Sequence, residues 1–256
     1  MCGIAGVYGY NAIRLSLLIT LGQLDRGTLG TGVAWVNNDK VKMLKEPIHP
    51  VKFTKKYYDR FDTKVRVAIS HNRQPSRGNV SYFNTHPFMD CYRRFALIHN
   101  GSCSLEHTIV KTLRNTHRIL GETDSELICH ALEQFYLEYN DMVKAIEELF
   151  SIGFQGAILI LTKDGKIYGA RKGMYPLHYC VTSKHVFLAS EPEAIENVVE
   201  ENVKIIPLKS KQIIEVDGKN VTIHGKGEDE IEQDIYVWFR SLRCSNKPYW
   251  YMDNLF

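Results

Sequence analysis

MCGIAGVYGY (1–10) opens the chain and joins a second-position cysteine to a short apolar run between glycines. The run Ile4 to Tyr8 predicts a first β-strand, and Cys2 stands directly before it. Removal of Met1 would leave a thiol and a free α-amine on one residue. An α-amine titrates at roughly 7.7–8.0, so it can take the thiol proton directly or through one water. This stretch predicts a nucleophile for acyl transfer, and a small buried cysteine is the alternative.

Length and charge bound the class of protein. The chain has 256 residues, 44% of them hydrophobic, which is enough for one large packed domain or two small ones. The net charge is +3 and both signs are mixed along the sequence, so no nucleic-acid or membrane-surface footprint is expected. No apolar stretch approaches the ~20 residues of a membrane helix, and the first residues do not resemble a signal peptide.

The cysteines are scattered rather than paired. Neither a CxxC pair nor an HExxH motif occurs among the residues of the sequence. The pattern therefore predicts no metal site and no dense disulfide framework. No phosphate-binding loop is evident, so no cofactor is expected either. A reducing compartment, the cytoplasm, is the expected location.

The order of predicted elements favours an α+β fold. Strands come first, then three helical patterns between about 109 and 150, and then a strand-rich region from 157 to 224. Asp-Gly pairs at 164–165 and 217–218 predict two hairpins. Together these patterns predict antiparallel sheets with helices packed outside them.

A change in composition suggests a domain boundary near Gly225. We expect one domain over residues 1–225, followed by a linker and tail over 226–256. The stretch GKGEDEIEQD (225–234) is polar and acidic, as linkers and exposed turns often are. The region after it is rich in aromatic residues, so we expect it to dock on the domain or on a partner.

Six short motifs occur in one order along the chain. They are Cys2-Gly3-Ile4, Arg26-Gly27, His71-x-Arg73, Asn84-x-His86-Pro87, His99-Asn100-Gly101 and Thr123-Asp124. This ordered set resembles class II glutamine amidotransferase domains, which are N-terminal-nucleophile hydrolases, and most of all the glutaminase half of glucosamine-6-phosphate synthases. The resemblance covers roughly the first 200 residues. It implies a four-layer α/β/β/α sandwich and release of ammonia from L-glutamine through a γ-glutamyl thioester.

The resemblance assigns the chemistry to three residues. Cys2 would attack the side-chain carboxamide, with its own amine as base and then as acid. The side-chain amide of Asn100 and the backbone N–H of Gly101 would stabilise the oxyanion. Taken alone, His99-Asn100-Gly101 would also fit an ordinary Asn-Gly turn.

Substrate binding is assigned by the same resemblance. Arg73 would pair with the α-carboxylate of glutamine and Asp124 with its α-ammonium group, while Ser76 and Gly78 belong to the loop that closes over the substrate. Taken alone, Arg73 would be an ordinary surface arginine and Asp124 an ordinary helix start.

Five further residues are expected around the nucleophile without reacting themselves: Arg26, Gly27, His71, His86 and His99. Each histidine would also fit a buried, hydrogen-bonded core position.

Two departures from the family pattern affect the expected function. Gln74 stands where related synthases have tryptophan, so we expect the loop to exclude water and retain ammonia differently. Only about 30 residues follow Gly225, so we expect a separate synthase or ligase subunit to accept the ammonia. The alternatives are an N-terminal-nucleophile amidohydrolase acting on another small amide, and a noncatalytic glutamine-sensing or scaffold subunit.

Overall fold

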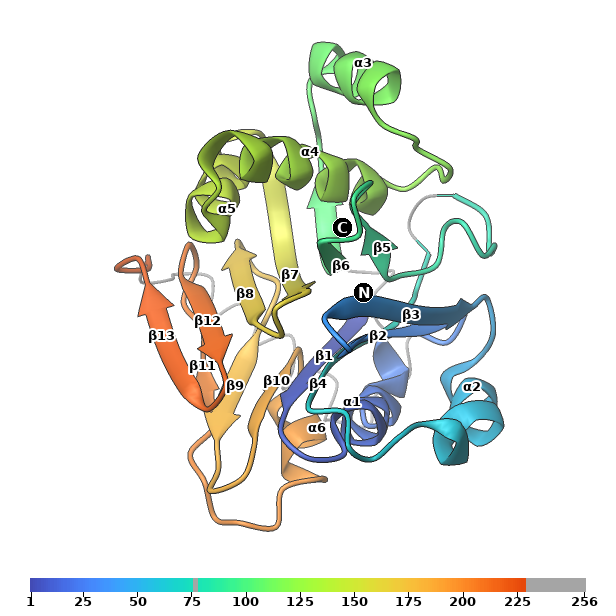
Figure 1. Cartoon of the computed structure of the whole chain (residues 1–256), viewed down its shortest axis with the longest axis vertical. Helices are drawn as coiled ribbons and strands as arrows, with labels where there is room; N and C mark the ends of the chain where they lie inside the picture. The colour runs from blue at the N-terminus through green and yellow to red at the C-terminus, as the bar shows by residue number, and fades with distance from the viewer. Residues whose placement is uncertain (76–77, 229–256) are drawn as a thin grey trace, which may run out of the picture.

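The computed structural model describes residues 1–75 and 78–228, and within them two antiparallel sheets pack face to face (Figure 1). The first sheet has the strand order β11-β9-β10-β1-β4-β2-β3. Its strands are β1 (Gly3–Tyr8), β2 (Thr31–Asn37), β3 (Lys40–Glu46), β4 (Val67–Asn72), β9 (His178–Val181), β10 (Val186–Ala189) and β11 (Ile206–Pro207). The strand that follows Cys2 is therefore central, with a partner on each edge.

The second sheet has the order β13-β12-β8-β7-β6-β5. Its strands are β5 (Phe88–Met89), β6 (Phe95–Cys103), β7 (Phe154–Thr162), β8 (Ile167–Lys172), β12 (Ile213–Asp217) and β13 (Asn220–His224). Both predicted hairpins are confirmed, because β7 pairs with β8 and β12 pairs with β13 across the two Asp-Gly turns.

Helices cover the outer face of each sheet. The helical elements are α1 (Ala12–Leu21), α2 (Pro50–Tyr57), α3 (His107–Thr116), α4 (Asp124–Tyr139), α5 (Met142–Ser151), α6 (Pro192–Glu196) and the short 3-10 turns η1 (Leu24–Arg26) and η2 (Tyr58–Arg60). One apolar core joins α1, α2 and α6 to the first sheet, a second joins α4 and α5 to the other sheet, and a third lies between the sheets. The predicted four-layer α/β/β/α sandwich is confirmed.

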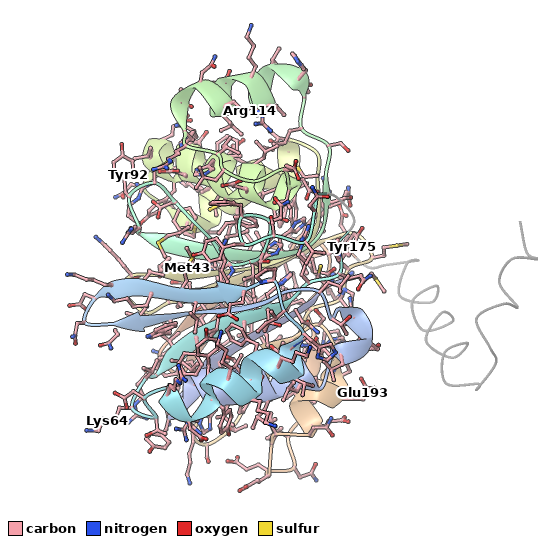
Figure 2. The ribbon with its side chains drawn as sticks, turned by 90° about the vertical axis from the view of Figure 1, so that its right-hand side faces the viewer. Met43, Lys64, Tyr92, Arg114, Tyr175 and Glu193 are labelled. Carbon is pink, nitrogen blue, oxygen red and sulfur yellow. The ribbon has the colours of Figure 1, made fainter. Side chains whose placement is uncertain are left out.

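Figure 2 shows the layers edge on. Arg114 of α3 lies on one side, Glu193 of α6 on the other, and Met43 of β3 between them. Three separate cores of buried aliphatic side chains hold the four layers together, and each buried side chain of this kind contributes roughly 1.5–3 kcal/mol relative to exposure.

Strand alternation determines which side chains face the space between the sheets. On β6, Ala96 and Ile98 belong to the core between the sheets, whereas Phe95 and Leu97 pack under the helices. Successive side chains in a strand point to opposite faces, so Asn100 continues the inner row.

The motif His99-Asn100-Gly101 lies inside β6, which continues to Cys103, so the interpretation as a simple Asn-Gly turn is wrong. The reason is pairing: β7 begins at Phe154 and continues the ladder opposite these residues, with Asn100 opposite Ala157. Because the motif lies in a paired strand, its side chains point in fixed, alternating directions, whereas in a turn their directions would be less constrained.

Two predicted features fall partly or wholly outside the described residues. Ser76 of the expected glutamine loop is one, and the region 229–256, with most of the acidic linker and the aromatic tail, is the other. The division of the chain at Gly225 stays a prediction. Within the described part, β13 ends at His224, and the backbone N–H of Glu228 donates to the Ser210 carbonyl at 2.9 Å.

Candidate active site

Cys2 and Asn100 meet between the two sheets. Cys2 precedes β1 in the same inward-facing row as Ile4, and Asn100 lies in the inward-facing row of β6. The Cys2 backbone N–H donates to Asn100 Oδ1 at 2.9 Å. Residues 98 positions apart are therefore joined at the atom that would become the α-amine after loss of Met1.

The Cys2 sulfur is held by the backbone of Gln74. The Gln74 N–H donates to Cys2 Sγ at 3.3 Å, and Sγ lies 3.5 Å from the Gln74 carbonyl oxygen. Burial raises the pKa of the Cys2 thiol, while the Gln74 N–H and the positive charges of the N-terminus and Arg73 act in the opposite direction. A thiol in this environment needs a nearby base before it can react.

Asn100 has one amide atom in use and one available. Its Oδ1 accepts from Cys2, but its Nδ2 is buried with no hydrogen-bond partner among the described residues. A buried donor without a partner is costly, typically about 1–3 kcal/mol, and such atoms often mark functional sites. Asn100 Nδ2 therefore fits a donor reserved for a ligand.

Gly101 is required by close packing. A Cβ at this position would lie 2.3 Å from the Gln155 carbonyl oxygen and 2.5 Å from the Gly156 Cα. Backbone atoms cannot move aside as a flexible side chain would, so only glycine fits here.

Arg73 lies directly before Gln74 and is buried, with its guanidinium donating to the Asn79 carbonyl at 2.9 Å and to the Gly78 carbonyl at 3.3 Å. Burial lowers the Arg73 pKa, and the charge of a Cys2 thiolate would raise it, so the two groups are electrostatically coupled. The two carbonyls are neutral, so these two hydrogen bonds orient the guanidinium without cancelling its positive charge.

Asp124 is the first residue of α4 and is half-buried. Thr123 is the N-cap but makes no side-chain capping bond, and its Oγ1 has no partner among the described residues. Asp124 Oδ2 instead accepts from the Cys103 N–H at the end of β6, at 2.9 Å. Asp124 is thus more than a helix start, because it ties α4 to the strand that carries Asn100.

Gly78 has φ +71, and a Cβ there would lie 2.7 Å from Asn84 Nδ2. The left-handed conformation and the close approach both favour glycine. Gly78 therefore shapes the loop whose carbonyls hold Arg73.

Arg26 is fully buried and holds the N-terminal segment. Its Nε donates to the Cys2 carbonyl at 2.9 Å, its Nη1 pairs with Glu191, and its Nη2 lies 3.8 Å from Met1 Sδ. Gly27 lies against Arg73, since a Cβ there would be 2.6 Å from the Arg73 carbonyl carbon. Both residues position Cys2 and Arg73 rather than offering a reactive group.

The three histidines are buried next to one another. The rings of His71 and His86 stack with centroids 3.9 Å apart, and His71 Nε2 lies 3.1 Å from the His99 carbonyl. Burial lowers the pKa of His71 to about 3 and that of His86 well below its ordinary value, so both rings are neutral. His99 Nδ1 lies 3.0 Å from Ser125 Oγ on α4. The group spans the sheets and links β4, β6 and α4.

Sequence reasoning missed three residues that hold the segments around Cys2 in place: Glu191, Gln23 and Asn72. Glu191 pairs with Arg26, and its N–H donates to Gln23 Oε1 at 3.2 Å. Asn72 Nδ2 donates to the carbonyls of Gln23 at 2.6 Å and Gly27 at 3.0 Å. The sequence LASE (188–191) was the available signal for Glu191, whereas nothing local distinguished the other two.

Solved structures with the same arrangement define the fold class. Glutamine phosphoribosylpyrophosphate amidotransferase from B. subtilis superposes with a TM-score of 0.73 at 20% identity, over 89% of this chain and 50% of that one. A glutamine aminotransferase class-II domain protein from Silicibacter pomeroyi gives 0.59 at 15% identity, over 89% of this chain and 100% of that one. The fold is that of the N-terminal-nucleophile amidotransferases.

The family follows from the sequence. The family model for class-II glutamine amidotransferases matches residues 12–211, and the chain belongs to this family of glutamine-hydrolysing enzymes. The glutamine–fructose-6-phosphate aminotransferase (isomerizing) of Staphylococcus aureus is 28% identical over 240 residues, which are 93% of this chain and 39% of that protein. The chain thus spans about two fifths of the length of the curated relatives it matches.

Among the described residues, no helix is both long and apolar enough to cross a membrane.

Proposed function

We propose that this chain hydrolyses L-glutamine to glutamate and ammonia through a γ-glutamyl thioester on Cys2, after removal of Met1. The observation that carries the proposal is the contact between the Cys2 main-chain nitrogen and Asn100 Oδ1, next to an Asn100 Nδ2 that has no partner among the described residues. Nucleophile, base and oxyanion donor then lie around one point, as acyl transfer requires.

The proposed reaction proceeds in two halves. The Cys2 thiol gives its proton to the α-amine, and Sγ forms a bond to the carboxamide carbon, whose oxygen takes up the negative charge. Asn100 Nδ2 and the Gly101 N–H stabilise that oxyanion. The C–N bond then breaks, the α-ammonium group protonates the leaving nitrogen, and ammonia departs. Water attacks the thioester, the C–S bond breaks, and glutamate and the Cys2 thiol are released.

Arg73 and Asp124 are the proposed contacts for the amino-acid head. The buried guanidinium of Arg73 suits the α-carboxylate, and the half-buried carboxylate of Asp124 suits the α-ammonium group. Their opposite charges favour an amino acid over an uncharged amide. The arrangement therefore supports glutamine rather than another small amide as the substrate.

We further propose that the ammonia passes to an acceptor held by a separate synthase or ligase. The named relatives carry more than twice the matched length, and their acceptor chemistry belongs to those proteins. Copurification of an untagged partner with the tagged chain, followed by glutamine-dependent amination of that partner's substrate, would support this arrangement. Amination by the purified chain alone would contradict it.

A diazo-ketone analogue of glutamine tests the central proposal. Intact mass before and after treatment should show a chain that lacks Met1 and gains one adduct. The Cys2→Ala variant should gain none, and Arg73→Gln should label slowly at the same analogue concentration. Glutamate release from L-glutamine should follow the same order.

The same experiment can also contradict the proposal. A folded wild-type chain with Met1 removed that neither labels nor releases glutamate would contradict hydrolysis and favour a noncatalytic glutamine-binding subunit. Calorimetric binding of L-glutamine would then distinguish a sensor from a scaffold.

A further inference from the structure

Four side chains with metal-binding chemistry converge away from Cys2. Cys91 lies in the turn between β5 and β6, His117 follows α3, and His130 and Glu133 lie one turn apart on α4. Their ligand atoms all lie within 4.8 Å of one another. We call these four residues the Cys91 cluster.

The distances suit one small cation. Cys91 Sγ lies 3.4 Å from His117 Nδ1 and 3.8 Å from His130 Nδ1. Glu133 Oε2 lies 3.1 Å from His117 Nδ1 and 2.9 Å from His130 Nδ1. Ligand atoms around tetrahedral zinc, with Zn–S about 2.3 Å and Zn–N or Zn–O about 2.0–2.2 Å, lie roughly 3.3–3.8 Å apart. The two distances from Cys91 Sγ fall in this range, and the two from Glu133 Oε2 are shorter than it by about 0.2–0.4 Å.

Burial and charge agree with this geometry. The side chains of His117 and His130 are each 4% exposed and that of Glu133 is fully buried, whereas Cys91 lies at the surface and leaves a route for entry. A thiolate and a carboxylate would neutralise a divalent cation. The neighbouring cation, Arg94, pairs with Asp90 at 2.8 Å and lies 3.6 Å from Glu133.

Contacts behind the ligands would orient them. Gln134 Nε2 lies 2.8 Å from His117 Nε2, and the Gln134 amide can present either its nitrogen or its oxygen there. With the oxygen in place, Nε2–H donates to it and the lone pair of Nδ1 is directed at the cluster. Glu133 is fixed by the Cys91 N–H, which donates to Oε1 at 3.1 Å. Supports of this kind accompany most protein metal ligands.

We propose that Cys91 Sγ, the Nδ1 atoms of His117 and His130, and a carboxylate oxygen of Glu133 bind one zinc ion. The thiol proton of Cys91 leaves to solvent on binding. Four protein ligands close the coordination sphere, which is the pattern of a structural site rather than a catalytic one. The sequence pattern predicted no metal, because the ligands come from three separate segments.

A zinc ion here would hold in place the segment between His117 and Asp124, which leads to the proposed glutamine site. This consequence rests on the proposed function. Only six residues separate His117 from Asp124, and one of them, Glu122, donates its N–H to Asn84 Oδ1 at 2.8 Å. Asn84 Nδ2 in turn donates to the Asn79 carbonyl, which also accepts from Arg73. Loss of the metal should therefore raise the KM for glutamine more than it lowers kcat.

Metal content of the purified full chain, freed of any histidine tag, tests the proposal without reference to activity. After equilibration with zinc and desalting, elemental analysis should find about one zinc per chain. Cys91→Ser and His117→Ala should lose it, while His107→Ala, an exposed histidine on the same helix region, should keep it. Gln134→Ala should weaken zinc affinity by about 10–100-fold.

Cobalt substitution of the wild-type chain avoids the risk that a variant fails to fold. Bound Co²⁺ should show a thiolate-to-metal charge-transfer band and the intense d–d bands of tetrahedral coordination. Absence of stoichiometric zinc, or a cobalt spectrum without the thiolate band, would overturn the assignment and leave Glu133 as a buried carboxylate held by histidines. A chain that binds zinc but does not hydrolyse glutamine would contradict the proposed function alone.

Discussion

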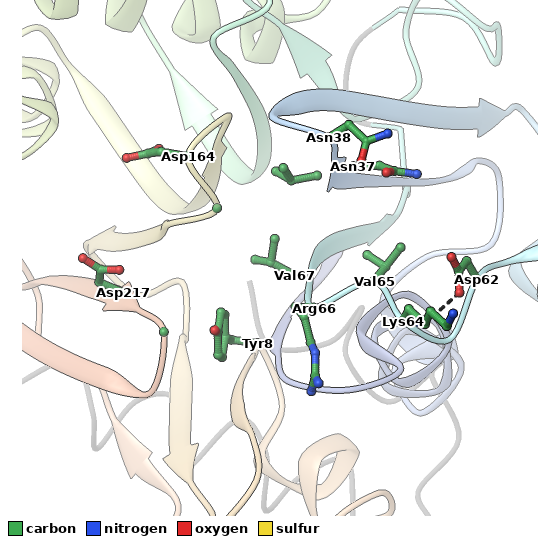
Figure 3. A pocket seen from close by; sticks show the side chains of 13 residues that line it. Tyr8, Asn37, Asn38, Asp62, Lys64, Val65, Arg66, Val67, Asp164 and Asp217 are labelled. Atoms are coloured by element: carbon green, nitrogen blue, oxygen red, sulfur yellow. Dashed lines mark hydrogen bonds between the residues drawn. The ribbon is translucent and has the colours of Figure 1, made fainter.

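The two ends of β1 differ in what they offer a ligand. At the Tyr8 end the surface is hollowed into a cavity of about 400 Å³, lined by Asp62, Arg66, Asp217 and their neighbours (Figure 3). At the Cys2 end the side chains are packed, and buried polar atoms such as Asn100 Nδ2 have no partner among the described residues. The charged side chains that line the cavity are exposed to solvent, so they carry little desolvation penalty. We therefore place the proposed chemistry at the Cys2 end rather than in the hollow.

The largest effect expected from this comparison is at Cys2. Cys2→Ala should abolish glutamate release, a loss on the order of 10⁶ in kcat, because loss of a nucleophile removes the covalent route. Tyr8→Phe, at the other end of the same strand, should leave the rate unchanged. Steady-state glutaminase assays on both variants would check this, and equal losses would mean that the strand, not the thiol, matters.

The second-largest loss of activity is expected at Asn100. Asn100→Ala should lower kcat by about 10²–10³-fold with a smaller change in KM, since an oxyanion donor acts in the transition state. The control is Asn37→Ala, an exposed amide beside the cavity. An unchanged kcat in Asn100→Ala would remove the proposed oxyanion role.

Arg73 should affect binding more than chemistry. Arg73→Gln removes a charge-assisted pair worth about 1.5–3 kcal/mol, so KM for glutamine should rise about 10–100-fold. Arg66→Gln, which removes the same charge at the cavity, should leave KM unchanged. Initial rates across glutamine concentrations separate the two parameters, and a fall in kcat alone would argue against a substrate contact.

The last prediction concerns the pH dependence of stability rather than activity. Lys45 is buried and donates to the carbonyls of Thr85 at 2.6 Å and Pro87 at 3.0 Å, and burial lowers its pKa from 10.5 to about 8. Between these values the unfolded chain holds a proton that the folded chain has released, so stability should rise with pH, by about 3 kcal/mol at most. Denaturant unfolding from pH 8 to 10.5 measures this rise.

Two variants show whether the rise comes from Lys45. Lys45→Met should flatten it, whereas Lys64→Met, an exposed lysine at the cavity, should not. A slope retained in Lys45→Met would assign the pH dependence to another group.

Lys45 also shows where sequence reasoning stopped. Periodicity revealed β1 and the helices α4 and α5, because their apolar rows are uninterrupted. It missed β3, whose inward row places a lysine beside Val41 and Met43 and so does not read as a buried strand. Two backbone carbonyls satisfy that lysine, and they belong to residues 40 and 42 positions away.

The candidate site, too, could be predicted only in part from the sequence. Motif order pointed to Cys2, Arg73, Asn100 and Asp124 as candidate site residues, and three of them, Cys2, Arg73 and Asp124, lie at or next to the end of an element. It did not reveal that Asn100 lies within a strand, since strand length depends on the partner, β7. Nor did it reveal the Cys91 cluster, whose members have no fixed spacing and meet only through the fold.

The contact between Arg26 and Met1 has a consequence for the life of the protein. Met1 is 49% exposed in the folded chain, although its sulfur rests on the buried guanidinium that also holds Cys2. If Cys2 acts through its own α-amine, as proposed, the chain becomes active only after Met1 is removed, because that nitrogen is otherwise part of a peptide bond. The active fraction in a cell would then follow the supply of processing enzyme rather than the rate of translation, and overproduced protein would be a mixture of two populations.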